Sequence, residues 1–149
     1  MSWRRVSQSD SVNDLYSPTL VSRMQQPGLS DRIIKLDRNI RFVGVVNGRG
    51  EVIEGGFQQG IHPLLDGTEE QQMYVQSLAN MTTLQQFSDR LGKVRYSITE
   101  HEKVILLTVP LPDGILCVSA ASRADPIKLR DKVMKAVKPR ARVRPAGKK

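Results

Sequence analysis

The segment Ile40–Gly55 constrains the fold more than any other part of this chain, because it joins an apolar strand pattern to the chemistry of a tight turn. Its sequence is I-R-F-V-G-V-V-N-G-R-G-E-V-I-E-G. Both faces of the run Ile40–Val46 are apolar, which predicts a central strand covered on both sides. Asn47-Gly48-Arg49-Gly50 predicts a hairpin turn, since Asn and Gly tolerate the positive φ angles of tight turns. Val52-Ile53 continues the returning strand, which we expect Gly55-Gly56 to end or to bulge.

A long helix is predicted after this hairpin. A capping box opens it, formed either by Asp66 with Glu69 or by Thr68 with Gln71. The helix extends to about Leu91, and the following glycine, Gly92, is placed to end it. Apolar residues recur along it every three or four positions, which predicts one buried stripe. The stripe consists of Tyr74, Leu78, Met81, Leu84, Phe87 and Leu91.

Three more strands are predicted beyond the long helix. Residues 94–98 alternate between apolar and polar side chains, as a half-exposed strand does. A turn at 100–102 leads into the apolar run 104–109. A second turn, at 110–114, leads into the apolar run 115–118. These runs predict consecutive antiparallel strands.

Two shorter helices are predicted at the ends of this region. Ser30 is a candidate N-cap of the first helix. Asp125-Pro126 combines an N-cap with a proline at the first helical position, and Pro139 limits that last helix. The whole order is short helix, two strands, long helix, three strands and final helix. This order predicts an α/β (α+β) domain.

Two motifs in this order carry a family resemblance. They are V-G-V-V-N-G-R-G-E-V-I-E-G in the first hairpin and K-V-I-L-L-T-V-P-L-P-D-G-I-L-C-V-S-A before the helix opened by Asp125-Pro126. With them, residues 33–137, about 105 of the 149, resemble a roadblock/dynein-light-chain-type domain, a branch of the profilin-like and longin-like modules. The short first helix and the long loop 57–67 depart from that pattern. The resemblance implies a five-stranded antiparallel sheet sandwiched between helices.

The resemblance also implies a non-catalytic homodimer that acts as a scaffold, adaptor or regulator of small GTP-binding proteins. Carried onto this sequence, the pairing surface is the edge 51–55 and the outer face of the helix 69–91. That face has few charges, whereas a helix facing only solvent usually carries more Lys and Glu, so we expect it to be covered. The predicted surface comprises Glu51, Val52, Ile53, Gln72, Val75, Gln76, Ala79, Thr82, Thr83 and Gln86.

The net charge of +8 belongs entirely to the C-terminal end. Residues 1–124 contain 13 basic and 13 acidic side chains, whereas residues 125–149 contain 10 and 2. One interpretation is a solvated helix face with a solubilising tail. Another is salt-dependent, sequence-independent binding to nucleic-acid phosphates. Anionic lipid is a weaker option, because the tail lacks a bulky apolar anchor. The predicted phosphate contacts are Lys128, Arg130, Lys132, Lys135, Lys138, Arg140, Arg142, Arg144, Lys148 and Lys149.

Patterns of catalytic or metal-binding residues are weak. The single cysteine, Cys117, excludes an intramolecular disulfide and a cysteine-rich zinc site, and in a strand it behaves as a small apolar residue. Glu100-His101-Glu102 is interpreted as a solvated turn, because adjacent residues do not easily converge on one metal ion. The run G-R-G-E-V-I-E-G-G lacks the phosphate-loop consensus and precedes a strand rather than a helix. We therefore predict no enzyme and no cofactor.

The predicted organisation is a flexible arm (1–29), one domain (30–138) and a basic disordered tail (139–149). Within the arm, Leu15–Met24 is a candidate docking segment. The sequence predicts neither a signal peptide nor a membrane span, and the lone cysteine favours a cytoplasmic protein.

A third hypothesis, besides the adaptor and the nucleic-acid-binding protein, is a small-molecule sensor of the PAS or GAF type. It ranks last, since the apolar strands offer few polar groups to orient a ligand.

Overall fold

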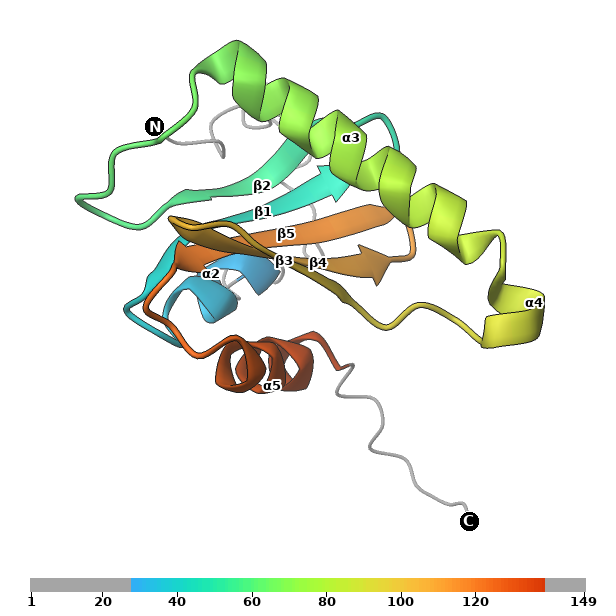
Figure 1. The fold of residues 1–149 in the computed structure, drawn as a ribbon. Coiled ribbons are helices and arrows are strands. Elements are labelled where there is room, and N and C mark those ends of the chain that lie inside the picture. The colour runs from blue at the N-terminus through green and yellow to red at the C-terminus, as the bar shows by residue number, and fades with distance from the viewer. Residues whose placement is uncertain (1–27, 139–149) are drawn as a thin grey trace, which may run out of the picture.

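The structure, a computed structural model, describes residues 28–138 as a five-stranded sheet between helices. The elements are α2 (Leu29–Ile34), β1 (Ile40–Asn47), β2 (Val52–Phe57), α3 (Gly67–Gln85), α4 (Ser88–Leu91), β3 (Ser97–Glu100), β4 (Val104–Leu111), β5 (Gly114–Ala121) and α5 (Pro126–Val137). All strand pairs are antiparallel, in the order β2-β1-β5-β4-β3. Helix α3 covers one face of the sheet, and α2 with α5 cover the other (Figure 1). The predicted α+β sandwich is confirmed. The predicted tail and nearly all of the predicted arm lie outside the described residues.

Two apolar cores, one on each side of the sheet, account for the two apolar faces of β1. Val43 points toward α2 and α5, whereas Phe42 and Val46 point toward α3. The larger cluster contains Ile33, Ile40, Val43, Ile105, Leu107, Val109, Leu116, Val118, Ala120, Ala124, Leu129 and Val133. The smaller contains Phe42, Val46, Tyr74, Met81 and Ile115. Strand β1 is therefore central and covered on both sides, as predicted.

The β1–β2 hairpin forms at the predicted turn, but its residues act differently from the prediction. The Asn47 side chain accepts hydrogen bonds from the N–H groups of Arg49 (2.9 Å) and Glu51 (3.1 Å), so it stabilises the turn through its oxygen. The positive φ falls on Gly50, at 84°. Gly55 does not end the strand, because β2 continues to Phe57.

The long helix begins as predicted and ends earlier than predicted. Asp66 and Glu69 form the capping box, with N–H to carboxylate distances of 2.8 and 3.0 Å. Helix α3 stops at Gln85, whose carbonyl accepts a hydrogen bond from the Ser88 hydroxyl at 2.7 Å. That hydroxyl competes with the backbone N–H that would have continued the helix. The segment to Leu91 is therefore a separate short helix, α4.

Two further boundaries differ from the prediction for physical reasons. Ser30 is not an N-cap but lies within α2, where its N–H and hydroxyl donate to the Glu54 carboxylate at 2.8 and 2.6 Å. The Ser30 N–H, at the start of α2, therefore finds its hydrogen-bond acceptor on β2, which is distant in the sequence. Strand β3 begins only at Ser97, which pairs with Thr108. Continuing that register would bring the ladder to Pro110, which has no N–H to donate.

Candidate interaction surfaces

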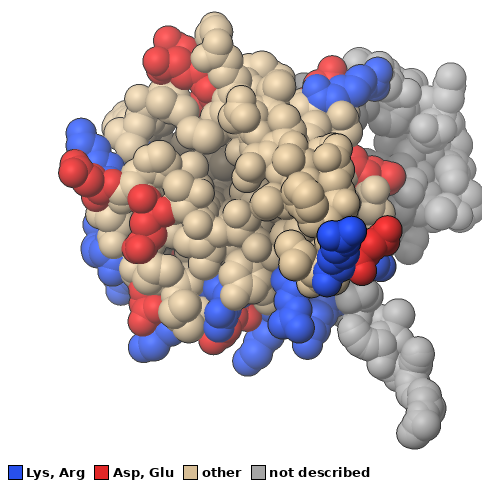
Figure 2. All heavy atoms as spheres, turned by 45° about the vertical axis from the view of Figure 1, so that its right-hand side comes forward, with Lys and Arg blue, Asp and Glu red and all other residues tan. Residues whose placement is uncertain are grey.

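The outer side of α3 is exposed and uncharged. No Lys, Arg, Asp or Glu occurs from Gln71 to Ser88. The face seen in Figure 2 is correspondingly tan over most of its upper and central part, with basic side chains gathered along the lower side. A helix face that meets only solvent usually carries charged side chains, so the absence of charge here is unusual. The predicted outer-face residues are all exposed: Gln72, Val75, Gln76, Ala79, Thr82, Thr83 and Gln86.

The turn of the β1–β2 hairpin contacts α3 directly. The Gln71 side chain donates to the Gly50 carbonyl at 2.9 Å, and Val75 packs so closely on Gly50 that a Cβ there would lie 2.8 Å from its methyl group. Ile53, on β2, is 56% exposed. The contacts therefore join α3 to the turn that precedes the predicted strand edge.

The other two predicted residues of the β2 edge contribute less to this surface. The Glu51 carboxylate is exposed but accepts a hydrogen bond from the Asn47 amide at 2.9 Å. Val52 is half-buried and packs against the smaller core. Ile53 is therefore the apolar side chain that this edge offers to a partner.

Three apolar side chains predicted to be buried are exposed instead. Leu84, Phe87 and Leu91 continue the periodic stripe of Tyr74 and Met81, yet Phe87 is 53% and Leu91 82% exposed. The reason is geometric: the end of α3 and the whole of α4 extend beyond the sheet (Figure 1). Periodicity identifies an apolar side of a helix but not how far the sheet beneath it extends. These residues enlarge the uncharged surface.

Helix α5 carries the described part of the predicted basic patch. Lys128, Lys132, Lys135 and Lys138 are exposed. Arg130 differs from them, because its guanidinium donates to the Tyr96 hydroxyl at 2.9 Å and to Asp131 at 2.7 Å and lies 5.4 Å from the Tyr96 ring centre. Arg130 is therefore engaged within the domain. The remaining predicted contacts, Arg140, Arg142, Arg144, Lys148 and Lys149, lie outside the described residues.

An ion pair joins α5 to the loop before β1. The Lys132 ammonium lies 3.2 Å from the Asp37 carboxylate, which also accepts the Asn39 N–H at 2.8 Å. The backbone hydrogen bond from Asn39 lowers the pKa of Asp37 most, and Lys132 lowers it further. A lowered folded-state pKa stabilises the fold above the unfolded value, near 3.9, and that stabilisation disappears as the pH falls through the folded value.

Replacing Asp37 by asparagine should therefore destabilise the fold at pH 7 and matter less near pH 3. Because Lys132 is exposed, we expect a difference of at most about 1 kcal/mol. Urea unfolding at both pH values measures it, with Asp113→Asn in the exposed β4–β5 turn as a control. A difference that is the same at pH 3 and pH 7 would contradict the role of the charge.

Comparisons with known proteins rest on the fold. No protein-family model matches the sequence, and no curated protein matches it significantly. A roadblock/LC7 domain from Streptomyces avermitilis matches with a TM-score of 0.56 and 17% identity over 73% of this chain and 91% of that one. MglB from Myxococcus xanthus gives 0.56 and 19% over 72% and 85%. An MglB structure with a tetrameric arrangement gives 0.59 and 14% over 79% and 91%. The described domain is roadblock-like.

The reactive side chains of the described domain are its one cysteine and its two histidines. Burial raises the pKa of the Cys117 thiol to about 12, so it is a poor nucleophile at neutral pH. His62 and His101 are both exposed. No group of His, Cys, Asp and Glu within residues 28–138 is placed to hold a metal ion. None of the helices in this range has the length and apolar character needed to cross a membrane.

Proposed function

We propose that this roadblock-like protein is a non-catalytic adaptor or regulator that works as a homodimer and binds a protein partner such as a small GTP-binding protein. The uncharged outer surface of α3 carries the proposal. Its residues are exposed and none of them is charged, whereas a helix face that meets only solvent usually carries charged side chains. The fold is similar to that of MglB, and one MglB structure has a tetrameric arrangement. This similarity supports the proposal that the protein forms oligomers.

The composition of this surface suits close pairing of two helices. Ala79, Thr82 and Thr83 are small, so two α3 helices can approach closely around a two-fold axis. Val75 and Ile53 add apolar area beside them. A self-complementary contact of this kind leaves other surfaces, including the α4 end, available for a different partner.

Two measurements on the full-length protein test the proposal. Light scattering over a range of concentrations should give the mass of two chains. Capture from native extract, with nuclease present, should retain a protein partner. A mass of one chain at every concentration would contradict the dimer, and loss of all partners with nuclease would contradict the adaptor role.

Nucleic-acid binding is the second candidate, supported by the arrangement of charges on α5. Lys128, Lys132 and Lys135 are spaced by four and three residues, so they form one exposed stripe along the helix. Within residues 28–138, the one ion pair that this stripe forms is that of Lys132 with Asp37. The stripe leads into residues 139–149, which hold five more basic side chains.

Deletion of residues 139–149 should weaken binding to duplex DNA about tenfold or more and reduce its dependence on salt. Each lost phosphate contact reduces the magnitude of the negative slope of log affinity against log salt by about 0.9. Fluorescence anisotropy with a labelled duplex at several salt concentrations measures both quantities. Deletion of residues 1–27 is the control. Equal slopes for the intact and shortened chains would refute phosphate binding by this segment.

A further inference from the structure

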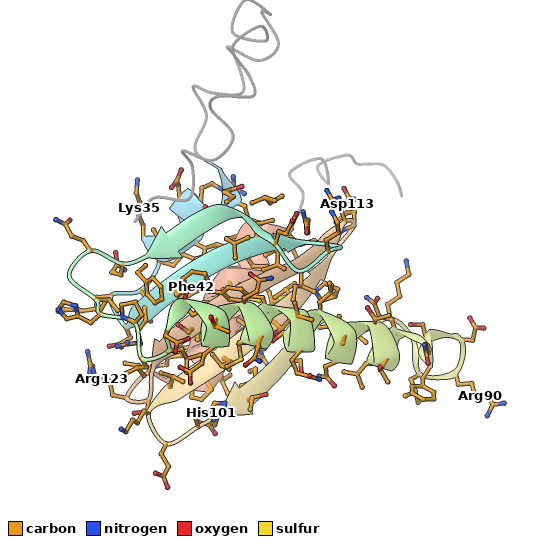
Figure 3. All side chains as sticks on the ribbon, turned by 90° about the horizontal axis from the view of Figure 1, so that it is seen from above. Lys35, Phe42, Arg90, His101, Asp113 and Arg123 are labelled. Atoms are coloured by element: carbon orange, nitrogen blue, oxygen red, sulfur yellow. The ribbon has the colours of Figure 1, made fainter. Side chains whose placement is uncertain are left out.

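A cavity of about 500 Å³ lies between α3 and the sheet. Most of its wall is apolar and includes Phe42, Phe57, Met73 and Leu106. In Figure 3, α3 crosses the sheet with Phe42 close to its first turns and His101 on its other side; both residues line the cavity. The volume falls within the range of roughly 300–1,000 Å³ typical of small-molecule sites.

Polar side chains from three elements converge on this apolar cavity. They are Tyr74 and Ser77 from α3, Thr108 from β4, and Cys117 and Ser119 from β5. Within residues 28–138, none of these side chains is hydrogen-bonded to another group. Tyr74 is the most constrained, because it is only 6% exposed and its ring stacks on Phe42 with centroids 5.7 Å apart. A buried hydroxyl without a partner is costly, so a ligand that accepts its hydrogen bond would gain affinity.

The cavity wall disfavours a negatively charged ligand. Burial raises the pKa of the Tyr74 hydroxyl and of the Cys117 thiol, which shows that a negative charge is poorly solvated beside either side chain. Desolvation, and then the nearby Asp66, raise the pKa of the Glu70 carboxyl, another wall residue. The guanidinium of Arg41, one cation of the lining, already donates to the His62 carbonyl at 2.9 Å. The other, Lys103, is exposed and follows the exposed Glu102 of the same lining, so these two side chains add no net charge.

We propose that this cavity binds an uncharged aromatic molecule with a carbonyl group, whose oxygen accepts the hydrogen bond of Tyr74. The rings of Phe42, Tyr74 and Phe57 provide flat apolar contacts for an aromatic system. The hydroxyls of Ser77 and Thr108 provide further donors. This site is separate from the outer face of α3 and does not depend on the adaptor function.

The uncharged fluorescent ketone 6-propionyl-2-(dimethylamino)naphthalene is a suitable probe for the full-length protein. Its emission should shift to the blue with saturable binding. Tyr74→Phe removes the donor and keeps the ring, and should weaken binding about three- to tenfold. Tyr96→Phe, outside the cavity, should leave the affinity unchanged. The naphthoate with a carboxylate in place of the ketone should bind more weakly than the ketone. Equal affinity for ketone and naphthoate, or for the two tyrosine variants, would overturn the proposal.

Cys117 gives a second measurement that needs no variant. It is the only cysteine and lines the cavity, so its slow alkylation by iodoacetamide at mildly alkaline pH, which partly offsets the raised pKa of the buried thiol, reports access to this site. The ketone should slow alkylation with the same half-saturating concentration as the fluorescence change. Alkylation that slows with protein concentration and is indifferent to the ketone would show that a second copy covers the cavity, which would also overturn the proposal.

Discussion

Replacing Ala79 by arginine is expected to dissociate the proposed homodimer and to raise its dissociation constant at least about 100-fold. Ala79 is an exposed small residue in the middle of the outer face of α3. A two-fold contact brings both copies of a central residue close together, so two guanidinium groups would meet. No acidic side chain between Gln71 and Ser88 can pair with them. An unpaired buried charge costs roughly 3–5 kcal/mol, and each 1.4 kcal/mol is a factor of ten.

Sedimentation velocity over a range of concentrations measures this effect. Ser122→Arg, in the exposed β5–α5 loop, is a matched control that adds the same charge away from α3. Circular dichroism melting should show both variants folded, because both sites are exposed. An Ala79→Arg protein that remains a dimer would place the pairing surface elsewhere on the molecule. Dissociation of both variants would indicate a general effect of charge.

Local chemistry made much of the fold predictable from the sequence. The capping box of Asp66 and Glu69 and the turn at Asn47 depend on residues within four positions of each other, and both form. The capping of α2 was not predictable in this way. The carboxylate that binds Ser30 belongs to Glu54, 24 residues away. Only the folded sheet brings these two groups together.

The candidate surfaces were predictable to a similar extent. The lack of charge from Gln71 to Ser88 is a property of the composition, and it identified a helix face that the structure exposes. The cavity was missed because its polar groups are dispersed in the sequence. Thr108 and Cys117 are partners across β4 and β5, and each lies between apolar neighbours in its strand. Only the pairing of those strands beneath Tyr74 makes them neighbours in one wall.

Replacing Gly55 by alanine should destabilise the domain by about 3 kcal/mol or more, although the change adds only one methyl group. Gly55 has a φ of 116°, a conformation that costs an L-residue about 1–2 kcal/mol. In addition, its new Cβ would overlap the Val43 carbonyl oxygen on β1 and lie 2.9 Å from the Gly44 Cα. Backbone atoms cannot rotate away as side chains do, so β2 must separate from β1.

Gly60→Ala separates these two contributions. Gly60 also has a positive φ, 82°, but a Cβ there meets nothing within 4 Å. It should therefore cost only the conformational term of about 1–2 kcal/mol. Urea unfolding followed by circular dichroism measures both variants. Equal losses of unfolding free energy in the two variants would mean that the overlap of the new Cβ with β1 is relieved at no cost. A larger loss for Gly55→Ala would show that the position of the β2 edge, and with it Ile53 on the proposed pairing surface, depends on a glycine at this site.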